Sequence, residues 1–144
     1  MSVELSFSAD QDALRRARGE AREHAARLGA PQRVCDTVAL VVDELVNNAI
    51  EHGAAYRRAD LPLTVRIAVT PGGIAVEFYD REMPDEAVRE LHDALSQAGQ
   101  GAPALENERG RGLFLLSVYL DMLQVERDAG GGMCLRGLVV EGSG

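Results

Sequence analysis

Three polar residues, Glu44, Asn48 and His52, recur at every fourth position of one predicted helix. At about 100° per residue they form a shallow polar stripe that drifts by about 40° at each step. Asparagine is a mediocre helix former, yet Asn47 and Asn48 stand in tandem near the middle of this helix. A neutral carbonyl ligand beside a carboxylate suits Mg²⁺ that is held mainly by phosphate oxygens and water. The alternative interpretation is an ordinary solvent-exposed helix face, with Glu51 beside the stripe.

Two further segments carry residues that suit an anionic ligand. Gly110-Arg111-Gly112-Leu113 opens an apolar helix, where glycines let backbone N–H groups approach phosphate and the helix N-terminus favours negative charge. Glycine is also common at helix starts for other reasons. Asp80 ends an apolar strand. Its carboxylate either forms a turn or accepts a hydrogen bond from the amino group of adenine.

Hydrophobic periodicity and turn residues predict the elements that position these side chains. We expect strands over 3–7, 63–70, 73–79, 122–127 and 133–140, and helices over about 10–28, 31–52, 88–95 and 113–120. The segment between Asp80 and Gly110 holds one short helix and then a glycine-bearing stretch, which is typical of a lid. The order predicts an α+β fold in which a mixed, mostly antiparallel sheet carries its helices on one face as a two-layer α/β sandwich. We expect one domain over 1–144.

Composition excludes several kinds of chemistry. The 144 residues carry a formal net charge of −8, and every one of the 15 basic residues is an arginine. A P-loop lysine, a Schiff-base lysine and the strand lysine of eukaryotic-type protein kinases are therefore excluded. The acidic balance argues against a nucleic-acid-binding surface, which needs clustered positive charge.

The remaining composition points to the cytoplasm and away from metal-binding scaffolds. Cys35 and Cys134 lie in apolar neighbourhoods and are predicted to be buried thiols, and the three histidines form no ligand pattern. The first residues lack the basic start and apolar run of a signal peptide. No stretch approaches the roughly 20 apolar residues that span a bilayer, so we expect no membrane partner.

The order of these motifs resembles a known family. Glu-x3-Asn-x3-His-Gly on a helix, an aspartate after a hairpin strand, a long lid and Gly-x-Gly-Leu are similar to the Bergerat-fold (GHKL-type) ATP-binding domain of histidine kinases and gyrase-type ATPases. Within that superfamily the chain most resembles the single-domain anti-sigma factor and serine-protein kinase family. The phrases DELVNNAIEHG and ERGRGLFLLSVYLDML carry the closest likeness, which covers essentially the whole chain.

This resemblance implies a role for each motif residue, with ATP and Mg²⁺ as cofactors. Glu44 matches the general base, and Asn48 matches the Mg²⁺-coordinating asparagine. Asp80 matches the aspartate that recognises adenine. Gly110 and Gly112 match the glycines beside the triphosphate.

The resemblance also implies that three further residues lie near the nucleotide. His52 lies where the family often keeps a histidine, Leu113 completes the glycine motif, and Arg111 supplies positive charge that no lysine provides. One position departs from the family pattern: relatives usually have a glycine two residues after the aspartate, where this chain has Glu82. A negative side chain beside an anionic ligand is expected to lower its affinity.

The resemblance also implies partners and an activity. It implies a bacterial switch protein that sequesters a sigma factor and phosphorylates a serine or threonine of a small STAS-type anti-anti-sigma antagonist. The alternative, motivated by Glu82, is a binding module without catalysis that regulates by partner exchange. Arg15, Arg18 and Arg22 form one face of the first helix, either a solvated face paired with nearby acids or a docking surface. Relatives pair through the first strand and helix, so we expect a homodimer.

Overall fold

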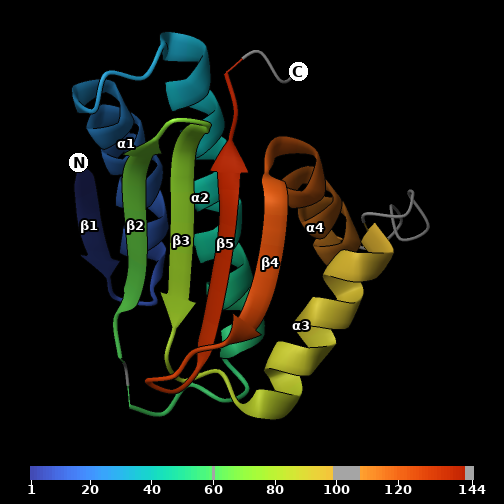
Figure 1. Ribbon diagram of the computed structural model, residues 1–144. Coiled ribbons are helices and arrows are strands. Elements are labelled where there is room, and N and C mark those ends of the chain that lie inside the picture. Colours follow the sequence, from blue (N-terminus) through green and yellow to red (C-terminus); the bar gives the residue numbers. More distant parts are fainter. Residues whose placement is uncertain (60, 99–107, 142–144) are drawn as a thin grey trace.

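The computed structural model describes residues 1–59, 61–98 and 108–141, arranged as a sheet with helices against one of its faces (Figure 1). The five strands are β1 (Ser2–Phe7), β2 (Leu63–Thr70), β3 (Gly73–Asp80), β4 (Asp121–Arg127) and β5 (Met133–Val139). Their order is β1-β2-β3-β5-β4. The predicted two-layer α+β fold is confirmed.

One detail of the predicted sheet is corrected. The sequence suggested a mixed, mostly antiparallel sheet, whereas all four described pairings are antiparallel. The reason is the place of β5. It lies between β3 and β4 and runs opposite to both, so these two strands share a direction without forming a parallel pair.

Four helices complete the fold: α1 (Gln11–Arg27), α2 (Gln32–Gly53), α3 (Asp85–Ala98) and α4 (Glu108–Tyr119). The first two lie side by side behind the sheet, and the other two lie beyond its β4 edge (Figure 1). Since α2 contacts α1, α4, β3 and β5, it is the central element of the helical layer. No helix in the described ranges is long and apolar enough to cross a bilayer.

Small residues set the approach of α1 to α2. The Asp10 carboxylate caps α1 by accepting a hydrogen bond of 2.9 Å from the amide of Ala13. Every fourth residue from there is a buried alanine: Ala13, Ala17, Ala21 and Ala25. Side chains at this spacing share one helix face, so α1 presents a narrow surface of methyl groups to its neighbour. Gly29, at a φ of 93°, ends the helical segment as predicted.

The opposite face of α1 carries the predicted arginines. Arg15 pairs with Asp12 at 3.2 Å, and Arg22 pairs with Asp36 of α2 at 3.0 Å. These pairs favour the solvated, charge-paired interpretation of this face.

On the edge strand β1, Phe7 is buried in the core and is therefore not available for contact with a second copy of the chain.

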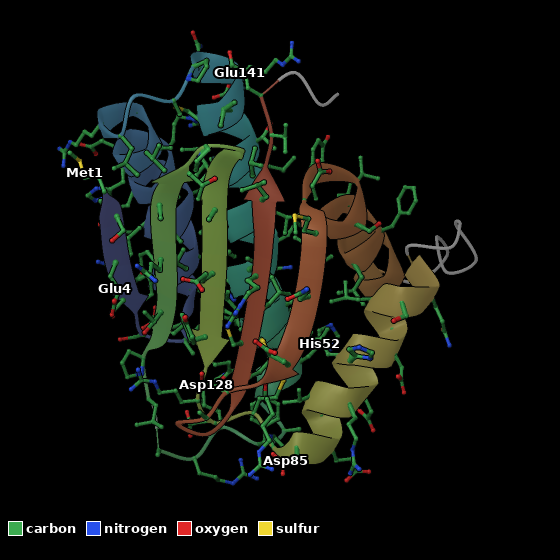
Figure 2. The ribbon with its side chains drawn as sticks, in the orientation of Figure 1. Met1, Glu4, His52, Asp85, Asp128 and Glu141 are labelled. Atoms are coloured by element: carbon green, nitrogen blue, oxygen red, sulfur yellow. The ribbon has the colours of Figure 1, made fainter. Side chains whose placement is uncertain are left out.

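The loops that build the candidate site meet at one end of the sheet. Asp85 at the start of α3 and Asp128 in the β4–β5 turn lie at that end, whereas Met1 and Glu141 lie at the other (Figure 2). Arg127 at the end of β4 pairs with Asp85 at 3.1 Å. A Cβ on Gly132, whose φ is 83°, would overlap the Asp80 carbonyl oxygen, so the turn packs directly on the end of β3.

The predicted lid is described only in part. Its first half is α3, which buries Val88, Leu91 and Leu95 as the amphipathic pattern predicted. Residues 99–107, where the glycine-bearing half of the lid was expected, lie outside the described residues.

Candidate functional site

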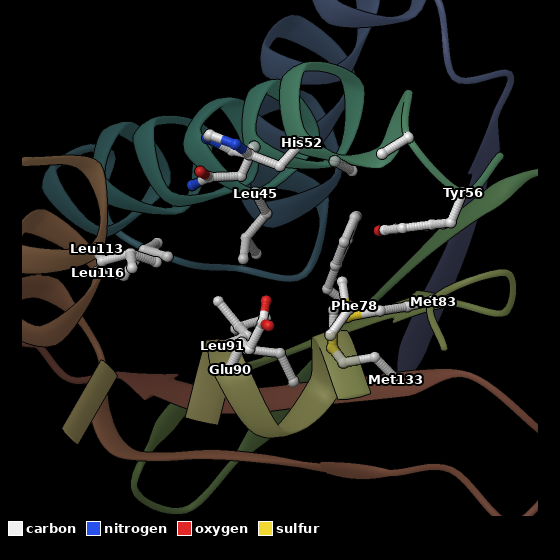
Figure 3. A pocket seen from close by; sticks show the side chains of 15 residues that line it. Leu45, His52, Tyr56, Phe78, Met83, Glu90, Leu91, Leu113, Leu116 and Met133 are labelled. Carbon is white, nitrogen blue, oxygen red and sulfur yellow. The ribbon is translucent and has the colours of Figure 1, made fainter. Parts of the chain in front are cut away.

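A cavity of about 220 Å³ lies between α2, α3, α4 and the strands β3 and β5 (Figure 3). Its walls are mainly apolar, and the polar lining side chains are Asn48, His52, Tyr56 and Glu90. A concave apolar site with a few polar groups is the usual form of a small-molecule pocket. Among the described residues, no group of three or more His, Cys, Asp or Glu side chains is placed to hold a metal ion.

The polar stripe of α2 borders this cavity. Asn48 and His52 line it, and Glu44 lies one turn earlier, half-buried like Asn48. Gly112 of α4 packs directly on this stripe: a Cβ built there would lie 2.7 Å from Oε2 of Glu44 and 3.6 Å from Nδ2 of Asn48. The fold thus brings together two predicted motifs that are far apart in the sequence.

The glycine motif lies deeper in its helix than expected. α4 begins at Glu108, so Gly110 is among its first four residues, whose amides have no partner within the helix, and Gly112 is not. Close contact with Glu44 is the reason that the structure gives for glycine at 112. Leu113 is buried and lines the cavity. The side chain of Arg111 lies outside the described residues.

Asp80 ends β3 as predicted, and its carboxylate is fully engaged by protein donors. Arg57 binds it through two hydrogen bonds, Nη1 to Oδ1 at 3.1 Å and Nη2 to Oδ2 at 2.9 Å. The Tyr56 hydroxyl donates to Oδ2 at 2.9 Å, and the amide of Glu82 donates to Oδ1 at 3.2 Å. Asp80 is 1% exposed and Arg57 8% exposed. A carboxylate has about four acceptor positions, and these contacts use all of them.

Glu82 also differs from the expectation. Instead of facing a ligand, its carboxylate accepts hydrogen bonds from the backbone amides of Arg58, Ala59 and Leu61, at 2.9, 2.6 and 3.1 Å. It also accepts one from Arg57 Nη1 at 3.2 Å. The amide bonds, that of Ala59 foremost, hold the pKa of Glu82 below its usual value. The carboxylate is therefore turned toward the α2–β2 connection, and the lower affinity for an anionic ligand that was expected from its charge stays a prediction.

Sequence reasoning missed Tyr56 and Arg57. Burial works against the charge of Arg57, but its hydrogen bonds to Asp80 and the charge of that carboxylate outweigh burial, so the pKa of Arg57 is raised. The sequence did contain one feature that is explained by Arg57. Gly53 ends α2, and a Cβ there would overlap the Arg57 guanidinium. The glycine of the His-Gly pair therefore leaves room for this arginine.

The two cysteines are buried and free, as predicted. Met133 lines the cavity, while Cys134 lies beside Arg136, whose Nη2 donates to its sulfur at 3.5 Å.

The fold and this arrangement define a class of protein. Residues 7–137 match the model of the histidine kinase-like ATPase domain, and the chain belongs to that family. This confirms the family predicted from the motifs.

Among solved structures, the chain is similar to a chain in the crystal structure of the SiaB–SiaC complex from Pseudomonas aeruginosa. The TM-score is 0.72 and the sequence identity 16%, over 95% of this chain and 88% of that chain. At this identity the similarity shows the fold alone. A comparison with curated proteins finds no match.

Proposed function

We propose that the protein binds Mg–ATP beside the α2 stripe and transfers the γ-phosphoryl group to a serine or threonine of a small STAS-type antagonist protein. In this proposal it is an anti-sigma-like switch that sequesters a sigma factor when the antagonist is phosphorylated. The observation that carries the proposal is the convergence of Glu44, Asn48 and Gly112 beside the cavity, in a chain of the histidine kinase-like ATPase family. The similarity to a chain from a two-protein complex supports a protein partner.

The residues present fit Mg²⁺ that is bound together with a nucleotide. An amide oxygen on Asn48 and a carboxylate on Glu44 are oxygen ligands of the kind that Mg²⁺ prefers. A complete protein cage is not required, because this ion usually keeps several waters and takes substrate phosphates as ligands. The direct packing of Gly112 leaves no side chain between α4 and these two groups.

The chain's own residues then have defined tasks. Mg–ATP supplies the transferable phosphoryl group and the positive charge that offsets the phosphates. Asn48 positions the phosphate end, and the amide of Gly110 at the start of α4 donates to a phosphate oxygen. Glu44 accepts the proton that the incoming hydroxyl loses. Leu113 excludes water from this part of the cavity.

A second candidate function is a binding module without catalysis. The contacts of Asp80 favour it, because the carboxylate that the resemblance assigns to adenine already has four protein donors. Such a module would regulate by exchange of protein partners. Homodimerisation and a cytoplasmic location remain predictions from the sequence.

Calorimetric titration with ATP, with and without Mg²⁺, tests the proposal. We expect Asn48→Ala to weaken Mg²⁺-dependent binding at least about tenfold, the effect of losing roughly one metal-linked contact. Asn47→Ala is the matched control, because Asn47 is the neighbouring amide on α2 and does not line the cavity. Equal affinity in wild type and Asn48→Ala would refute the site. No binding by a folded wild type would favour the second candidate.

A further inference from the structure

Asp80, the residue that the family resemblance assigns to adenine, belongs to a buried cluster of charged side chains. The proposed function does not use this cluster. Asp80, Arg57 and Glu82 are all nearly inaccessible to solvent, at 1%, 8% and 6% exposure of their side chains. Tyr56 adds its hydroxyl and points toward the cavity interior (Figure 3). Of these four residues, Tyr56 lines the cavity, whereas Asp80, Arg57 and Glu82 lie behind its lining.

Arg57 has little freedom to leave Asp80. Its Nη1 donates to both Asp80 Oδ1 and Glu82 Oε2, at 3.1 and 3.2 Å. Its Nη2 donates to Asp80 Oδ2 at 2.9 Å and to the carbonyl of Ala49 at 3.2 Å. All four N–H bonds of the two terminal nitrogens therefore have acceptors. A paired arginine–carboxylate contact of this kind is also stronger than a neutral hydrogen bond.

The segment that carries Arg57 is anchored independently. Glu82 accepts from three backbone amides of this segment, those of Arg58, Ala59 and Leu61. Because Glu82 also contacts Arg57 itself, it acts as a positioning residue for the guanidinium. Gly53 provides the space into which the guanidinium fits.

We propose that Arg57 sets the base selectivity of the site by occupying the carboxylate of Asp80, so that adenine is not distinguished from guanine. The exocyclic amino group of adenine is a donor and needs an acceptor. With Arg57 and Tyr56 in place, Asp80 has no acceptor position left for it. The nucleotide is then held by its phosphate end and by apolar contact of the base. This inference rests on the proposed nucleotide binding.

Titration of the whole chain with Mg–ATP and Mg–GTP tests this assignment. For the wild type we expect dissociation constants within about threefold of each other. Arg57→Ala frees one acceptor position on each carboxylate oxygen of Asp80, while the Tyr56 hydroxyl and the Glu82 amide keep the others. We therefore expect this variant to bind ATP about tenfold more tightly, as one hydrogen bond to a charged group does, and to bind GTP unchanged. Arg58→Ala is the matched control, because the Arg58 side chain contacts only carbonyl oxygens of its own segment in the described structure.

A second variant keeps the test valid if Arg57→Ala does not fold. Tyr56→Phe retains the ring and frees one acceptor position on Oδ2, so we expect a smaller shift toward ATP in the same direction. A wild type that already prefers ATP at least tenfold would overturn the role of Arg57 and leave nucleotide binding intact. Failure of every folded variant to bind either nucleotide would overturn both.

Discussion

The variant Gly112→Ala is expected to lower the activity of the site without lowering the stability of the fold. In a helix interior alanine is more favourable than glycine by about 1 kcal/mol, which favours the variant. The new Cβ would lie 2.7 Å from Oε2 of Glu44, whereas ordinary contacts begin at 3.4 Å, so this oxygen must move by about 0.7 Å. Because the oxygen ends a flexible side chain, the movement costs little stability. A misplacement of about 1 Å in a catalytic group can cost about 10²-fold in rate.

We therefore expect Gly112→Ala to keep or gain up to about 1 kcal/mol in free energy of unfolding and to lose about 10²-fold in Mg²⁺-dependent ATP turnover. Turnover is measured as ADP release, with water standing in for the hydroxyl acceptor. Gly19→Ala is the control, since a Cβ on this exposed glycine of α1 meets nothing within 4 Å. It should gain stability without any change in turnover. Wild-type turnover in Gly112→Ala would refute the assignment of Glu44 as the base.

Two further predictions concern the loops at the same end of the sheet. The pKa of Glu82 is lowered in the folded protein from 4.5, so its contribution to stability is present above that pH and is lost as the pH falls through the folded-state value. Acid titration of the free energy of unfolding should show a shallower decline for Glu82→Gln, and an unchanged slope would contradict this. Gly131→Ala and Gly132→Ala both impose a positive φ on alanine, but only the second meets backbone atoms within 4 Å. Chemical denaturation should therefore show Gly132→Ala to have a free energy of unfolding about 1–3 kcal/mol lower than that of Gly131→Ala. Equal losses in the two variants would contradict the packing of this turn on Asp80.

The helices and strands could be predicted because local spacing and turn residues indicate each of them. The buried alanines of α1 recur at helical spacing, and the β2–β3 strands flank a Pro-Gly-Gly turn. The strand order needed a different kind of information. The place of β5 between β3 and β4 depends on pairings between residues such as Phe78 and Leu135, which local periodicity does not encode.

The candidate site was predictable where its residues follow a fixed spacing. Glu44 and Asn48 share a face of α2 by helix geometry alone, and the fold brings Gly112 to them. Arg57 was not predictable in this way. It follows the end of α2 in a segment without periodicity. Gly53 is compatible with a bulky side chain packing on the end of α2, but the sequence does not show that Arg57 reaches Asp80 across the α2–β2 connection.

The departure at position 82 is best understood together with Arg57. A guanidinium that binds Asp80 through two N–H bonds still has further N–H groups to satisfy, and Glu82 and the Ala49 carbonyl accept them. With glycine at 82, one of these donors would lose its acceptor in a buried place, and three backbone amides would lose theirs. Ion pairs thus hold the Asp80 end of the candidate site, whereas close packing of α2 and α4 forms the end at Glu44 and Gly112. A substitution at 82 is therefore expected to act on base recognition through Arg57, while the contact of Glu44 with Gly112 stays unchanged.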